Sequence, residues 1–171
     1  MGRLTDMAKK FITSDLINKI EKLTKQRMSE QPVVSLDQFR DAHKKMNPLN
    51  ILVIEDDETQ RLSLKRILEG EGYTTFLAAD SAELTAILDE EKELHLILMD
   101  IGLPWINGFE LAEMMKQHQD LKKLPLVFLS AHAEQADYDK AREVGAADYI
   151  KKPFDIEKLK IVISKLLSDN K

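Results

Sequence analysis

The sequence has no cysteine among its 171 residues, so neither disulfide bonds nor thiolate metal sites contribute to its structure. It also lacks any apolar run near the ~20 residues that a membrane-spanning helix needs. Its N-terminus has no apolar core of the signal-peptide kind, and we therefore expect a cytoplasmic protein with no membrane partner. Hydrophobic residues make up 43% and charged residues 32% of the chain. This composition and length are typical of one folded domain with an extension.

Charge is divided unevenly along the chain. Residues 1–50 contain ten Lys/Arg and six Asp/Glu, whereas residues 51–171 contain fifteen and twenty-four. The split indicates two parts with different surroundings. We place the boundary between a helical extension, residues 1–48, and an α/β domain, residues 49–171. The mildly basic balance of the extension, spread over helical faces, is more typical of a solvated surface than of nucleic-acid binding.

Two helices are predicted in the extension. Residues 3–28 carry an apolar stripe at steps of three and four, formed by Leu4, Ala8, Phe11, Ile12, Leu16, Ile20 and Leu23. Ser35 and Gln38 have capping-box spacing and predict a second helix over 35–46. The stripe needs a partner, which could be the chain's own second domain, another copy of the chain or another protein. We favour a dimerisation or partner-docking arm.

From residue 49 the pattern alternates between strand and helix. Strands are predicted over 51–54, 73–78, 94–99, 125–129 and 149–150, and each is followed by a helical pattern. The helices are expected to end near Glu69, Glu91, His118, Val144 and Leu167. Five strands alternating with five helices indicate a doubly wound parallel sheet covered on both faces. We expect the flavodoxin-like strand order 2-1-3-4-5.

Chemistry-bearing residues follow four of these strands. Asp100 ends the third strand, and Glu55 and Asp56 follow the first. Ser130 follows the fourth strand, and the pair Lys151–Lys152 follows the fifth. In the expected order these strand ends share one edge of the sheet, where ligands bind in such folds. Clustered carboxylates repel one another unless a cation such as Mg²⁺ is present. A metal, a lysine and a hydroxyl around Asp100 predict a phosphoryl site with Asp100 as nucleophile.

Several spaced motifs in residues 49–168 resemble the receiver domain of bacterial response regulators, the CheY-like family. They are Ile51–Glu58 with its acidic residues, Met99–Pro104 followed by Asn107–Gly108, Leu129–Ala131, and Tyr149–Phe154. The resemblance implies that Asp100 is the phosphoacceptor and that the metal is Mg²⁺ or Mn²⁺. Asp56 would bind the metal directly, Glu55 through water, and Gly102 through its carbonyl, while Asp57 is an extra acid at the helix start.

The last two motifs supply the remaining implied roles. Lys152, directly before Pro153, is the matching lysine, and Pro153 is expected to follow a cis peptide bond. Ser130 and Tyr149 match the switch hydroxyl and the rotating aromatic residue of the family. Gly102 and His132 stand at two positions that often tune aspartyl-phosphate lifetime in the family, so the lifetime in this chain stays open.

The resemblance implies a phosphorylation-switched response regulator, not an enzyme, that supports its own Mg²⁺-dependent phosphorylation and dephosphorylation. Its partners would be a histidine kinase or phosphotransfer protein and an unidentified output protein. Because the likeness runs nearly to the last residue, we expect output through protein contacts, including a homodimer through residues 1–48. Alternatives are a scaffold that takes no phosphate, opposed by the intact site residues, and a DNA-binding regulator, opposed by the absence of a helix-turn-helix signal. A haloacid-type hydrolase fits the motif spacing less well.

Overall fold

The computed structural model describes residues 48–90, 92–132 and 134–169. The two helices expected in residues 1–48 lie outside this part of the chain. No helix among the described residues is long and apolar enough to cross a membrane. The elements are β1 (Asn50–Ile54), α3 (Glu58–Gly70), β2 (Thr74–Ala78), α4 (Ser81–Asp89), β3 (Leu96–Asp100), α5 (Gly108–Gln117), β4 (Leu126–Ser130), α6 (Gln135–Glu143), β5 (Asp148–Lys151) and α7 (Ile156–Asp169).

The five strands form one parallel sheet in the order β2-β1-β3-β4-β5, and the predicted order is therefore confirmed. In this order β1 and β3 are neighbours, with Ile54 opposite Met99, and β3 and β4 are neighbours, with Asp100 opposite Leu129. The ends of β1, β3, β4 and β5 consequently lie side by side at one edge of the sheet.

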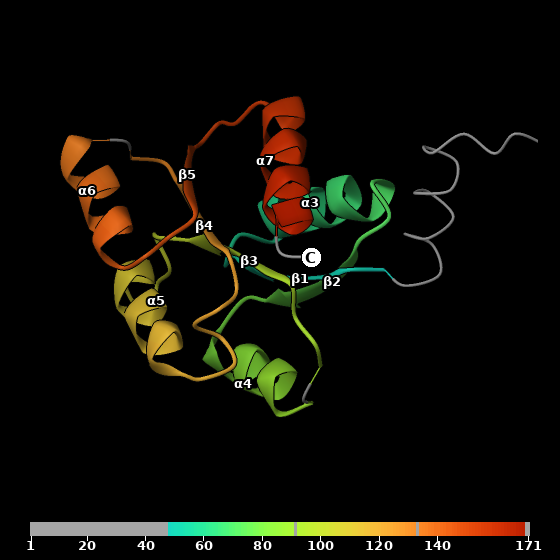
Figure 1. The fold of residues 1–171 in the computed structure, drawn as a ribbon, viewed down its shortest axis with the longest axis horizontal. Helices are drawn as coiled ribbons and strands as arrows, with labels where there is room; N and C mark the ends of the chain where they lie inside the picture. The colour runs from blue at the N-terminus through green and yellow to red at the C-terminus, as the bar shows by residue number, and fades with distance from the viewer. Residues whose placement is uncertain (1–47, 91, 133, 170–171) are drawn as a thin grey trace, which may run out of the picture. The chain divides into compact units, whose positions relative to one another are not determined.

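Alternate residues of each strand face opposite sides of the sheet, and both sides are covered by helices (Figure 1). On one side α3 and α7 bury Leu64, Leu68, Leu159 and Ile163 against the sheet. On the other side α4, α5 and α6 pack against the core around Phe128. The central strands β3 and β4 are buried along their whole length. Burial on both faces explains why these strands read as continuous apolar runs rather than alternating patterns.

Candidate functional site

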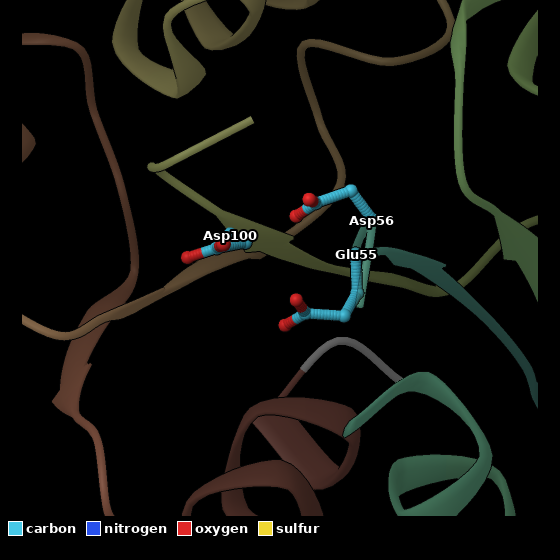
Figure 2. Close-up of side chains that lie close together, drawn as sticks. All are labelled: Glu55, Asp56 and Asp100. Carbon is cyan, nitrogen blue, oxygen red and sulfur yellow. The ribbon is translucent and has the colours of Figure 1, made fainter. Parts of the chain in front are cut away.

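Residues from β1 and β3 converge at the carboxyl edge of the sheet. Glu55 and Asp56 directly follow β1, and Asp100 is the last residue of β3. Figure 2 shows their carboxylates pointing into the same space, and one oxygen of each lies within 4.8 Å of the others. Glu55 and Asp100 are buried, whereas Asp56 is exposed. The three acids named from the sequence thus form one cluster, in which two are buried and the third is open to solvent.

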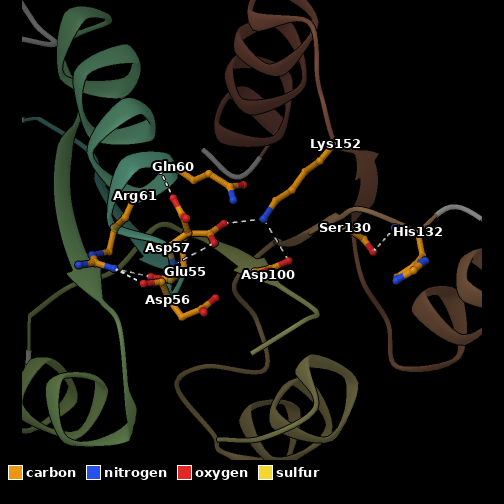
Figure 3. Close-up of polar contacts among 9 residues, drawn as sticks. All are labelled: Glu55, Asp56, Asp57, Gln60, Arg61, Asp100, Ser130, His132 and Lys152. Atoms are coloured by element: carbon orange, nitrogen blue, oxygen red, sulfur yellow. Dashed lines mark hydrogen bonds and ion pairs between the residues drawn. The ribbon is translucent and has the colours of Figure 1, made fainter. Parts of the chain in front are cut away.

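Lys152, just after the edge strand β5, reaches this cluster from the β5 side of the sheet (Figure 3). Its Nζ lies 2.6 Å from Glu55 Oε2 and 3.2 Å from Asp100 Oδ1. Burial raises the pKa of the Glu55 carboxyl above its usual value, although the hydrogen bond and positive charge of Lys152 oppose this shift. The preceding residue, Lys151, is exposed, and the Lys152–Pro153 peptide bond is cis. Of the two lysines considered from the sequence, Lys152 is therefore the one in contact with Asp100.

The turn that carries Glu55 and Asp56 is held in place by helix α3. Arg61 Nη1 donates to the carbonyl of Glu55 at 2.8 Å and to that of Asp56 at 2.9 Å. Asp57 caps the helix by accepting from the backbone N–H of Gln60, which accounts for the extra acid at this position. The sequence reading missed Arg61. The available signal was an arginine on the first turns of the helix, close enough to fold back onto the acidic turn.

Close approach of the backbone shapes the loop after Asp100. A Cβ atom at Gly108 would lie 2.6 Å from Ile101 Cα and 2.7 Å from the Asp100 carbonyl oxygen. The Gly108 N–H also donates to the Ile101 carbonyl, and Asn107 caps α5. A side chain at position 108 would push the start of α5 away from β3. Glycine here therefore keeps α5 and the loop against the end of the strand that carries Asp100.

Gly102 leaves the approach to Asp100 open on one side. A Cβ atom added at this position would lie 3.6 Å from Asp100 Oδ2, so even the smallest side chain would touch the carboxylate. Trp105, later in the same loop, donates from its indole N–H to the Ala79 carbonyl at 3.2 Å. The adjacent carbonyl, that of Ala78, accepts from the Glu55 N–H. The indole is thus linked to the acidic turn through β2, which makes it a suitable fluorescent reporter.

Ser130 and Tyr149 meet at the loop that follows β4. Ser130 lies one residue beyond Leu129, the strand partner of Asp100, and its hydroxyl accepts from the His132 N–H at 3.1 Å. The Tyr149 hydroxyl donates to the His132 carbonyl at 2.8 Å. The Tyr149 ring is buried and packs against Tyr138 of α6, with the ring centroids 4.6 Å apart. Burial also raises the pKa of the Tyr149 phenol. Tyr149, which matches the rotating aromatic position of the family, is thus buried in this structure.

The donor set of the acidic cluster fits a hard divalent cation. Carboxylate oxygens are the ligands that Mg²⁺ prefers, and one or two of them usually suffice. Asp56 and Asp100 offer two carboxylates close together, and the side chain of Asp56 is open to solvent. No cysteine or histidine belongs to the cluster among the described residues, so the site favours oxygen-seeking metals over zinc or copper.

A doubly wound parallel sheet with three clustered acids and a lysine at one edge is typical of one class of signalling domain. Residues 51–164 match the family model of the response regulator receiver domain, and the chain belongs to this family. Among curated relatives, the aerobic respiration control protein ArcA of Escherichia coli is 40% identical over 123 residues, which are 72% of this chain and 50% of ArcA. The chain thus spans about half the length of this relative. The polar-differentiation response regulator DivK of Brucella anthropi is 29% identical over 71% of this chain and 98% of its own length.

Solved receiver domains share the fold. The non-phosphorylated receiver domain of HemR from Leptospira biflexa superposes with a TM-score of 0.63 at 35% identity, covering 70% of this chain and 94% of that domain. The receiver domain of the sensor histidine kinase PA1611 from Pseudomonas aeruginosa has a TM-score of 0.63 at 26% identity, covering 71% and 98%. The latter structure has a magnesium ion coordinated in its active-site cleft. Each of these similarities covers about 70% of the chain.

Proposed function

We propose that this chain is a phosphorylation-switched response regulator that accepts a phosphoryl group on Asp100. The observation that carries the proposal is the contact of Asp100 with Lys152 beside the Glu55–Asp56 pair. Family membership supports it, and so does the presence of every polar residue that the phosphoryl site needs. In this proposal an oxygen of Asp100 attacks phosphorus, and the bond from phosphorus to the donor nitrogen of a phosphohistidine, or to the oxygen of a small acyl phosphate, breaks.

Positioning and charge neutralisation account for the proposed chemistry. Lys152 stands close enough to Asp100 to neutralise charge on the phosphoryl oxygens. Ser130, on the strand next to Asp100, supplies a hydroxyl donor to one of them. Bound Mg²⁺ or Mn²⁺ would supply further neutralisation, with Asp56, Asp100 and the Gly102 carbonyl as the ligands and Glu55 behind a water. The magnesium-containing PA1611 receiver supports this assignment.

The proposed output is a change at the surface of α6 and β5. Ser130 and Tyr149 both bond to the backbone of His132, so a hydroxyl drawn toward a phosphoryl oxygen would alter the loop that holds the Tyr149 ring. The proposed donors are a histidine kinase or a phosphotransfer protein, and the output partner is another protein. We further propose that the protein is cytoplasmic and acts through contacts with other proteins. In this proposal it catalyses only the gain and loss of its own phosphoryl group.

Acetyl phosphate labelling tests the phosphoacceptor. With Mg²⁺ present, the wild-type protein should gain the mass of one phosphoryl group, and Asp100→Asn should gain none. Asp57→Asn is the matched control, because it makes the same chemical change in the nearby helix cap and asparagine also caps well. Equal labelling of wild type and Asp100→Asn would refute the assignment, and loss of labelling in the Asp57 variant would show that the effect is not specific to Asp100.

A further inference from the structure

Lys152 contacts two buried carboxylates at unequal distances. Its Nζ donates a hydrogen bond to Glu55 Oε2 at 2.6 Å, whereas Asp100 Oδ1 stands at the longer ion-pair distance of 3.2 Å. The side chains of Lys152, Glu55 and Asp100 are 13%, 1% and 11% exposed. Among side chains this buried, an ammonium group stays with the carboxylate that receives its shortest hydrogen bond. Glu55 is therefore the first partner of the lysine, and Asp100 is the second.

The geometry separates the cluster into two halves. Glu55 and one oxygen of Asp100 face the ammonium group of Lys152. The other oxygen, Asp100 Oδ2, lies toward the open position at Gly102. Asp56 is exposed, and the structure gives its carboxylate no ion pair with a described residue (Figure 3). A cation entering the site would thus meet Asp56 and Asp100 first, while the charge of Glu55 is already neutralised.

We infer that Glu55 is a positioning residue that holds Lys152 back from Asp100 and thereby keeps the acceptor carboxylate available to the metal. The inference rests on the proposed function and replaces a mainly metal-directed role of Glu55 with a lysine-directed one. An ammonium group and a divalent cation compete for the same Asp100 charge. Without Glu55, Lys152 has Asp100 as its nearest buried carboxylate and moves onto it. Metal affinity should then fall because the lysine is misplaced, and removing the lysine should restore it.

A double-mutant cycle on Mg²⁺ affinity tests this coupling in the full-length protein. Wild type, Glu55→Gln, Lys152→Met and the double variant are titrated with Mg²⁺ and followed by Trp105 fluorescence or by calorimetry. Glu55→Gln should weaken Mg²⁺ binding by about tenfold or more, because the ammonium group of Lys152 then sits on Asp100. The double variant, which has the same net charge as the wild type, should regain nearly wild-type affinity.

Two controls keep the result interpretable. Lys151→Met removes the same charge one residue away from an exposed side chain, and its effect should be small and equal in both backgrounds. Asp56→Asn should weaken Mg²⁺ binding whether or not Lys152 is present. If Lys152→Met leaves Glu55 buried without a partner and the domain fails to fold, Lys152→Gln takes its place in the cycle.

A double variant that binds Mg²⁺ as weakly as Glu55→Gln alone would overturn the inference, because Glu55 would then act on the metal without the lysine. The cycle measures metal binding and needs no phosphorylation. If Asp100 labelling fails while the coupling is found, the proposed function is wrong and the role of Glu55 stands. If labelling succeeds while the double variant still binds Mg²⁺ weakly, only the role of Glu55 is wrong.

Discussion

Arg61 decides where the two acids after β1 point, because its guanidinium group holds both of their carbonyls. Replacing it by glutamine should lower the free energy of unfolding by about 1.5–3 kcal/mol, the usual cost of losing a hydrogen bond to a charged group. Metal affinity should fall as well, since the turn is no longer fixed. Urea unfolding and Mg²⁺ titration measure the two effects. Arg66→Gln, an exposed change on the same helix, should leave both unchanged, and equal losses in the two variants would contradict the role of Arg61.

Single residues differ in how well sequence predicts their place in the site. Glu55, Asp56, Asp100 and Lys152 were predictable because each directly follows or ends a strand, and parallel strand ends share one edge. The contact between Lys152 and Glu55 was not predictable, because it depends on how two long side chains fold toward each other across the two strands between β1 and β5. Arg61 escaped prediction for a similar reason, since an arginine early in the helix makes such a contact possible but the residue pattern does not identify backbone carbonyls as its partners.

At the scale of elements, the junction between β3 and α5 depends on glycine. Gly108→Ala should cost about 1–3 kcal/mol of stability, because its Cβ would meet the backbone of Ile101 and Asp100, which cannot give way easily. Gly70→Ala is the matched change. No atom lies within 4 Å of a Cβ at that helical position, so the variant should gain up to about 1 kcal/mol from helix propensity. Thermal unfolding of both variants checks the pair, and similar behaviour would refute the close-approach argument.

A second element-scale prediction concerns the link from β4 to β5. Beryllofluoride, a phosphoryl mimic, should change the NMR shifts of amides in α6 and β5, because Ser130 and Tyr149 share the backbone of His132. Ser130→Ala removes one hydrogen bond of about 1 kcal/mol, which should reduce the switched-to-unswitched ratio roughly fivefold to tenfold. Ser63→Ala on α3 should not alter the response. A full response in Ser130→Ala would show that the signal takes another route.

Most element boundaries were predicted to within one or two residues. Apolar runs such as 96–99 end where a carboxylate and a turn residue follow, and caps such as Asp80 mark the helix starts. The cap of α6 was harder to predict, since the helix begins at Gln135 behind a Glu134–Asp137 box rather than behind a serine, threonine, aspartate or asparagine. The packing of α6 through Tyr138 onto Tyr149 could not be read from the sequence, because it depends on the position of the following strand.

At the scale of the whole molecule, we expect residues 1–48 to have a role separate from that of the described domain. Its sheet is buried under five helices, and DivK matches 71% of this chain over 98% of its own length. The extension is basic and the domain acidic, so their charges favour contact within one chain or between chains, weakened by salt. This contact is a prediction from the sequence alone.

The extension carries the last prediction. A helix with an apolar stripe gains most of its stability from packing that stripe, and the stripe's spacing over about three heptads suits a helix pair. Full-length protein should therefore be a dimer by light scattering at tens of micromolar concentration, and a 49–171 truncation should be a monomer. Leu16→Glu, inside the stripe, should also give monomers, whereas Ser14→Glu, outside it, should not. Monomers for full-length and truncated protein alike, with and without beryllofluoride, would rule out self-association and leave the stripe to its own domain or to another protein.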